Sequence, residues 1–168
     1  TGRLIFEGAS VHTGTTTIAA GTLALAGGGS VSESNGVSIA SGATFDVSGV
    51  TSATAIRNLV GEGTVVLGTK ELQITQAAGE FAGSIAGSGS GTALSVLGGT
   101  LTLTGASTYT GNTSVGFLST LVLKDGGSIA STGRVVLDAA GTFDISQTTA
   151  GATVGGLDGG GLVSLGGR

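Results

Sequence analysis

The residues of this sequence that could carry acid–base or metal chemistry are few and scattered. Cysteine is absent, His12 is the single histidine, and ten residues carry carboxylates. The carboxylates are Glu7, Glu33, Asp46, Glu62, Glu71, Glu80, Asp125, Asp138, Asp144 and Asp158. A glycan hydrolase or lyase needs carboxylates that converge on one sugar ring. Asp46 and Asp144 are the pair to consider, because both follow the dipeptide Thr-Phe in a repeated segment.

The pattern around these two aspartates predicts that they do not act together. In the extended segment 44–48, Phe45 and Val47 fall on one side of the backbone and Asp46 falls on the other. If a stacked fold placed roughly four turns of chain between Asp46 and Asp144, they would lie about 20 Å apart at a sheet spacing of about 4.8 Å. We therefore interpret both as solvated surface residues, and we expect no catalytic residues and no enzymatic activity.

Metal, cofactor and phosphate sites are not indicated either. His12 has no cysteine or second histidine with which to complete a transition-metal site, so we expect it to pack at a turn. The glycine runs at 61–63 and 87–91 lack the lysine and the following helix of a phosphate loop. Residues 155–161 resemble one calcium-binding nonapeptide, but such sites need tandem copies. We therefore expect neither a metal nor a cofactor.

An internal repeat organises the chain. Gly14 in the segment 2–25 matches Gly111 in the segment 99–123, an offset of 97 residues. One extra residue near Phe117 raises the offset to 98 for the rest of the chain. We interpret the sequence as a single solenoid segment, residues 1–168. It holds one long unit at about 2–98 and most of a second at about 99–168.

Short strands separated by glycine-marked turns fill both units. In residues 100–104 two leucines fall on one side and three threonines on the other, the alternation of a half-buried strand. Residues 26–36 predict a turn and a surface loop. The 35 glycines, the 39% of hydrophobic residues and the charged fraction of only 10% indicate ordered β-structure and not a disordered chain. A β-sandwich would show similar spacing, but the internal repeat favours a β-solenoid without significant helix.

Charge and hydropathy exclude several partner classes. The net charge is −4 and the six basic residues are scattered, so the sequence contains no basic patch that would bind nucleic acid or an anionic membrane. Glycine, serine and threonine interrupt every apolar run before the roughly 18 residues that a membrane-spanning helix needs. The absence of methionine predicts that the sequence is a fragment of a longer protein, with any signal peptide outside it.

The start of the second unit carries the most specific motif. Its members are Gly99, Leu101, Leu103, Gly105, Tyr109, Thr110, Gly111, Thr113 and Val115. This pattern resembles the passenger-associated transport repeat of bacterial type V autotransporters, with Ser107 where the family usually has asparagine. The first copy, with Val11 and His12 in place of threonine and tyrosine, resembles it too. We expect a structural role for all nine residues.

The resemblance implies a right-handed parallel β-helix that is exported to the surface of a Gram-negative cell and anchored by an outer-membrane barrel outside this sequence. It implies a non-catalytic stalk or adhesin segment that also aids folding and secretion of the passenger. The expected partners are neighbouring repeats of the same chain, other passengers through self-association, and a host surface protein or glycan. A carbohydrate-binding or carbohydrate-active β-helix is the alternative.

Overall fold

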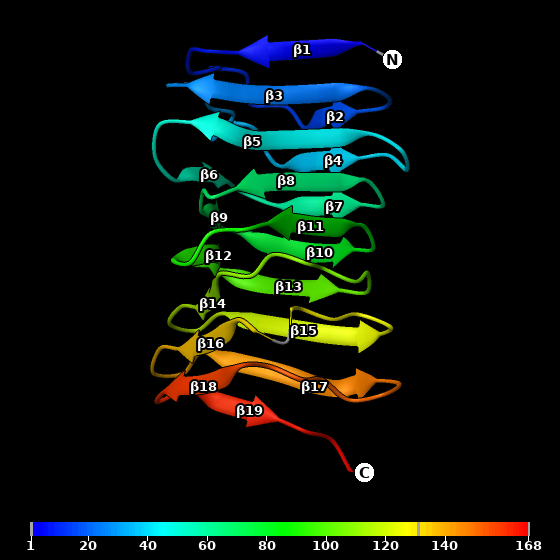
Figure 1. Cartoon of the computed structure of the whole chain (residues 1–168), viewed down its shortest axis with the longest axis vertical. Coiled ribbons are helices and arrows are strands. Elements are labelled where there is room, and N and C mark those ends of the chain that lie inside the picture. Colours follow the sequence, from blue (N-terminus) through cyan, green and yellow to red (C-terminus); the bar gives the residue numbers. More distant parts are fainter. Residues whose placement is uncertain (1, 131, 168) are drawn as a thin grey trace.

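The chain folds into a parallel β-solenoid in which three sheets run along one long axis (Figure 1). This computed structural model describes residues 2–130 and 132–167. Every strand pairing recorded among these residues is parallel. The two ends of the chain lie at opposite ends of the coil (Figure 1). No helix among the described residues is long and apolar enough to cross a bilayer.

Each sheet collects one strand from successive turns of the coil. Sheet 1 contains β1 (Arg3–Phe6), β3 (Thr22–Gly27), β5 (Thr44–Val50), β8 (Thr64–Gly68) and β11 (Ser84–Gly87). Sheet 2 contains β2 (Thr16–Ile18), β4 (Val37–Ile39), β7 (Leu59–Gly61), β10 (Ala77–Phe81), β13 (Gly99–Leu103), β15 (Thr120–Asp125), β17 (Thr142–Thr148) and β19 (Leu162–Ser164). Sheet 3 contains β6 (Thr54–Ile56), β9 (Leu72–Ile74), β12 (Thr92–Val96), β14 (Asn112–Val115), β16 (Arg134–Leu137) and β18 (Gly156–Gly159).

One turn of the coil, here called a rung, takes 20 to 22 residues when it is measured along sheet 2. Along sheet 2, Thr100 pairs with Thr120 and Thr120 with Thr142, which are steps of 20 and 22 residues. The eight strands of sheet 2 are joined by seven such steps. The chain is therefore an all-β solenoid of about seven turns, as the internal repeat predicted.

Stacked apolar side chains fill the inside of the coil. Phe81, Leu103 and Leu123 pair in register on successive rungs and are almost completely buried. Thr100 is exposed and Thr102 is half-buried, so the alternation predicted for this strand is confirmed. A single cluster of buried residues runs from Ile18 to Phe143. Each rung therefore hides its apolar face only because a neighbouring rung covers it.

The two repeat units do not occupy the same sheets. β1 belongs to sheet 1, whereas its counterpart β13 belongs to sheet 2. In the same way β4 lies in sheet 2 and its counterpart β16 in sheet 3. The physical reason is that 98 residues, at 20 to 22 residues per rung, make about four and two-thirds rungs instead of the four expected from the sequence. The second unit is thus displaced along the axis and turned around it as well.

One segment of each repeat unit lies outside the three regular sheets. In each unit the segment after the first strand, residues 8–14 and 105–111, contributes an isolated bridge and no named strand; the bridges are Ala9 with Ser30 and Ala106 with Ser128. Sheet 3 begins only after the first of these segments, and sheet 1 ends just before the second. Backbone bonds from Thr108 N to Ile85 O and from Thr110 N to Gly87 O satisfy the last edge of sheet 1.

Substitutions at two neighbouring residues of β13 test the inward and outward assignment. Leu103→Ala should lower the free energy of unfolding by about 2–5 kcal/mol, because it removes buried methyl groups and leaves a cavity between Phe81 and Leu123. Thr102→Ala is the matched control and should cost less than about 1 kcal/mol. Denaturant melts measure both values, and equal losses would contradict the assignment.

Candidate functional site

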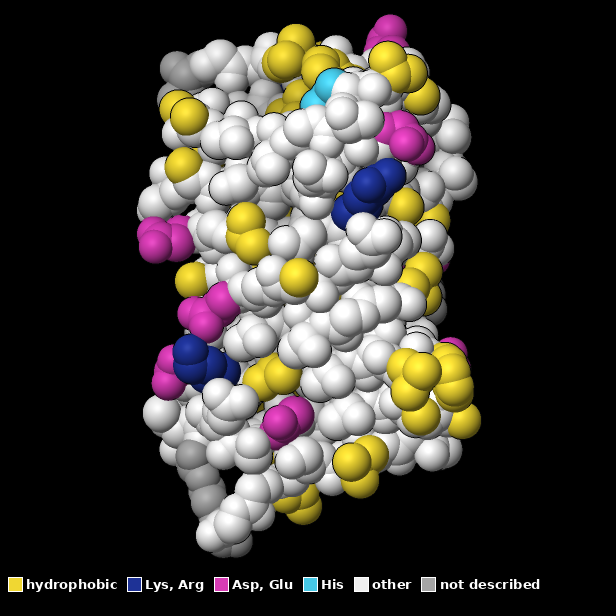
Figure 2. All heavy atoms as spheres, turned by 180° about the vertical axis from the view of Figure 1, so that it is seen from behind, with side chains coloured by type: hydrophobic (Ala, Val, Ile, Leu, Met, Phe, Trp, Pro, Cys, Tyr) yellow, Lys and Arg dark blue, Asp and Glu magenta, His cyan; other side chains and the backbone are white. Residues whose placement is uncertain are grey.

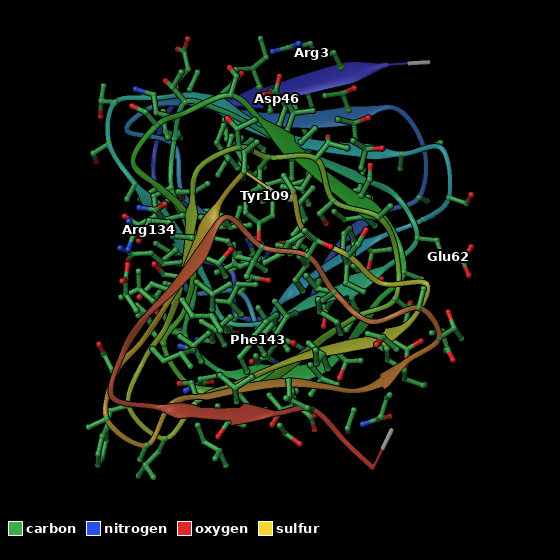
Figure 3. The ribbon with its side chains drawn as sticks, turned by 60° about the horizontal axis from the view of Figure 1, so that its bottom comes forward. Arg3, Asp46, Glu62, Tyr109, Arg134 and Phe143 are labelled. Carbon is green, nitrogen blue, oxygen red and sulfur yellow. The ribbon has the colours of Figure 1, made fainter. Side chains whose placement is uncertain are left out.

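The candidate site is the motif segment of the second unit, centred on Tyr109. This side chain points into the coil (Figure 3) and is only 1% exposed. Its hydroxyl lies 2.7 Å from the Thr113 hydroxyl, which is also buried. Burial raises the pKa of Tyr109 far above its ordinary value, and the hydrogen bond with Thr113 lowers the pKa only in part. Both hydroxyl groups therefore stay uncharged, and their hydrogen bond joins two buried side chains inside an apolar core.

The three motif glycines lie where the backbones of adjacent rungs come closest. Gly99 has a φ of +76°, which disfavours any side chain, and a Cβ there would collide with the carbonyl of Ala77. A Cβ on Gly105 or Gly111 would strike carbonyl oxygens of the preceding rung. These positions serve the stacking of rungs and offer no side chain to a ligand.

The remaining motif residues divide between the core and the surface. Leu101, Leu103 and Val115 belong to the buried apolar cluster. Thr110 is exposed, and its hydroxyl donates to the Gly89 carbonyl over 3.3 Å. Ser107, where the repeat family usually has asparagine, is buried and accepts a hydrogen bond from the Ile85 amide at 3.3 Å. The motif residues thus pack and hydrogen-bond one rung against the rung before it.

The first unit builds the same corner with histidine. His12 Nε2 lies 2.8 Å from the Thr16 hydroxyl, which is the arrangement of Tyr109 and Thr113 one unit later. The other ring nitrogen, Nδ1, lies 2.6 Å from the Ser10 hydroxyl. His12 belongs to the first rung and is exposed there. It packs at a turn as expected, and its ring makes two hydrogen bonds to hydroxyl groups.

A buried serine that the sequence did not reveal extends this network. The Ser34 hydroxyl donates to the Gly14 carbonyl over 2.6 Å and accepts from the Thr16 amide over 3.0 Å. The segment 26–36, predicted to form a turn and a surface loop, also buries Val31. The polar composition of this loop concealed the role, because the Gly14 carbonyl and the Thr16 amide that bond to Ser34 lie about one rung away in the sequence.

The structure keeps Asp46 and Asp144 apart. Asp46 lies on β5 in sheet 1 and Asp144 on β17 in sheet 2, so they face different sides of the coil. Each aspartate has its own partners: Asp46 pairs with Arg3 at 3.2 Å (Figure 3), and Asp144 accepts a 2.8 Å bond from the Ser146 amide. Two aspartates that repeat in the sequence therefore form no common centre.

Several other charged groups of the described chain form ion pairs or hydrogen bonds across rungs. Glu80 accepts from Lys124 over 2.9 Å, two rungs away and across β13. Asp158, in the stretch that resembles a calcium nonapeptide, is hydrogen-bonded to Arg134 Nε at 2.6 Å. No group of three His, Cys, Asp or Glu residues that could hold a metal ion occurs within residues 2–130 and 132–167.

Uncharged hydroxyl groups form columns along the outer faces. On sheet 2, Thr100, Thr120 and Thr142 stand in register, and on sheet 1 the same holds for Thr22, Thr44 and Thr64. The paired threonines of each Thr-x-Thr segment do not continue this register, since Thr102 stands beside Val122. The face of the coil seen in Figure 2 accordingly carries few charged side chains.

Comparison with known proteins agrees with this geometry. Residues 1–25 and 98–116, which open the two units, match the family described as Passenger-associated-transport-repeat. No curated protein and no solved structure matches the chain. The chain thus carries two passenger-associated transport repeats in a parallel β-solenoid. It is a β-helical repeat region of an autotransporter passenger, a class that Gram-negative bacteria secrete or display at their surface.

The buried hydroxyl pair gives a first prediction for this site. Tyr109→Phe should lower the free energy of unfolding by about 1–3 kcal/mol, because the Thr113 hydroxyl is left buried without this partner. Adding Thr113→Val should recover part of the loss, since both polar groups are then gone. Denaturant melts of the two single variants and the double variant measure this coupling. His12→Phe, at the exposed counterpart, is the control and should cost within about 0.5 kcal/mol.

Asp144 gives a prediction on acid stability. Partial burial acts to raise the pKa of Asp144, but the hydroxyls of Ser146 and Ser164 and the Ser146 amide bond to the carboxylate and together hold its pKa below the ordinary value. A lowered native pKa stabilises the fold above the unfolded pKa of about 3.9, and this contribution disappears as the pH falls through the native pKa.

Asp144→Asn should therefore reduce stability at neutral pH and flatten the loss of stability below about pH 4. Ser164→Ala, which removes one of the hydrogen bonds, should act in the same direction but less strongly. Denaturant midpoints measured from neutral pH down to about pH 2 give the slopes. An Asn variant whose slope equals that of the wild type would contradict this assignment.

Proposed function

We propose that this region is a non-catalytic scaffold that spaces or presents an autotransporter passenger at the cell surface, as a stalk or adhesin segment. The observation that carries the proposal is the use of the motif residues: they stack rungs, close a corner or fill the core. The coil is held at the outer membrane by a part of the protein outside this sequence. Its seven steps at about 4.8 Å extend the passenger by roughly 34 Å.

The charged residues support this choice over a carbohydrate-active β-helix. Glycoside hydrolysis needs two carboxyl groups within roughly 5–9 Å of each other across a sugar ring. Asp46 and Asp144 lie on different sheets, and Glu80 and Asp158 are ion-paired with Lys124 and Arg134. A contact surface for a host protein or glycan would instead use the threonine columns of sheets 1 and 2, which offer hydroxyl groups at rung spacing.

The architecture also suits a role in passenger folding. Each rung buries its apolar face on the rung before it, so a short coil can serve as the template for the next rung. Folding that extends in one direction would retain each newly emerged turn outside the cell. We therefore include assistance to folding and secretion in the proposed function.

Surface display of the whole passenger tests the scaffold role. Leu103→Asp places a charge in the core and should reduce the amount of passenger accessible to external protease at least about tenfold. Thr102→Asp adds the same charge at the outward neighbour and should leave display close to the wild-type level. Equal display of both variants would contradict the proposal.

Assays of polysaccharide turnover test the absence of catalysis. The purified chain should release no new reducing ends or unsaturated products from neutral and acidic polysaccharides. Asp46→Asn and Asp144→Asn should leave any binding unchanged beyond the effect of a surface substitution. Turnover that either substitution abolishes would overturn the proposal.

A further inference from the structure

An apolar patch interrupts the polar outside of the coil at the corner between sheets 3 and 2. Leu97, Phe117 and Leu118 form this corner patch, with exposed fractions of 46, 64 and 70%. In Figure 2 an apolar cluster stands at the right edge, toward the C-terminal end. The other large exposed apolar residues are Leu4, Ile5, Val11, Leu157, Leu162 and Leu165, in the first and last rungs. The corner patch therefore stays exposed even where further rungs cover both ends.

The fold does not require large apolar residues at this corner. Three turns are closed by equivalent amide-to-carbonyl bonds: Ser119 to Gly116 and Gly141 to Asp138 at this corner, and Ala43 to Ala40 at the corner between sheets 2 and 1. Their third residues have positive φ: Gly42 at 77°, Leu118 at 56° and Ala140 at 60°. Leucine is poorly suited to this left-handed conformation. Leu118 thus holds a backbone conformation that leucine disfavours, next to the exposed Phe117, and this points to a role outside the fold.

Backbone hydrogen bonds place the corner residues in one column along the coil. The Thr75 amide bonds to Ile56 O, the Leu97 amide to Ile74 O, the Gly116 amide to Val96 O and the Asp138 amide to Val115 O. In a parallel ladder these bonds stack Arg57, Thr75, Leu97, Gly116 and Asp138 on successive rungs. Arg57 and Asp138 therefore lie two rungs to either side of Leu97, roughly 10 Å away.

The equal spacing of Arg57 and Asp138 about Leu97 favours a second copy of the chain as the partner. We propose that a second copy of the chain binds the corner patch, antiparallel, about a two-fold axis through Leu97. The axis sets Leu97 against Leu97, and Phe117 and Leu118 against Thr75 and Gln76 of the second copy. It also sets Arg57 of each copy opposite Asp138 of the other. A parallel pair would instead set Arg57 against Arg57 and Asp138 against Asp138, where like charges repel.

The charged side chains at this corner are accessible to a second copy. Arg57 reaches only Glu33, at 3.7 Å, and both side chains are exposed. None of the ion pairs recorded for the described residues includes Asp138. The corner patch exposes about 300 Å² per copy, if a large side chain offers roughly 150–250 Å². A standard interface buries about 800 Å² per partner, so the pair should be weak, with a Kd of about 0.1–1 mM.

Sedimentation equilibrium of the 168-residue protein from micromolar to millimolar concentration tests the proposal. The wild type should form a dimer that does not grow further. Phe117→Ser with Leu118→Gly should weaken association at least about tenfold. Leu118→Gly alone should weaken it less and keep or improve folding, since glycine suits the positive φ. Circular dichroism melts confirm that each variant is folded.

A charge exchange tests the antiparallel register. Asp138→Arg should weaken the dimer, and Arg57→Asp with Asp138→Arg should restore it. Glu62→Arg makes the same change of charge at another corner, where Glu62 points away from the coil (Figure 3), and should leave the dimer unchanged. Absence of a dimer at millimolar protein, association that survives loss of the corner patch, or failure of the double exchange to restore association would each overturn the proposal.

Discussion

Parallel hydrogen bonding between successive rungs is the interaction on which this structure depends. Each rung of 20 to 22 residues presents its amides to the carbonyls of the rung before it, at a fixed spacing of about 4.8 Å. That spacing leaves no room for a side chain where two backbones turn together, which is why Gly105 and Gly111 stand at the motif corner. It also lets apolar side chains such as Phe81, Leu103 and Leu123 stack into one core.

The relation between repeat length and rung length shapes the surface. Because the repeat is about two-thirds of a rung longer than four rungs, residues that match in sequence do not stack in space. The aspartates of the two Thr-Phe-Asp segments face different sides, and β1 and β13 belong to different sheets. A duplicated motif in this chain therefore strengthens the scaffold and cannot by itself assemble a two-residue site. Columns of like residues arise instead from neighbouring rungs, as with Thr100, Thr120 and Thr142.

The two copies of the motif corner show how burial changes the residue that the same geometry accepts. Tyr109 is covered on all sides, and its hydroxyl needs the buried Thr113 as partner. His12 holds the corresponding position in the first rung, is exposed, and bonds to Ser10 and Thr16. The turns after the motif differ in side-chain size. Ala19 and Ala20 of the first unit correspond to the larger Phe117 and Leu118 of the second unit. The first difference is a consequence of packing, whereas packing does not explain the second.

The sequence by itself determined the strand alternation, the glycine turns, the repeat and the family motif, because side-chain direction and backbone freedom are local properties. Burial of Leu101 and Leu103 and the place of His12 at the position of Tyr109 follow from that pattern. Tertiary structure alone decided that the second unit is turned onto other sheets, that Ser34 is buried, and that Arg57, Leu97 and Asp138 share one column. These features depend on rung length, and only the hydrogen-bond register between neighbouring turns sets that length.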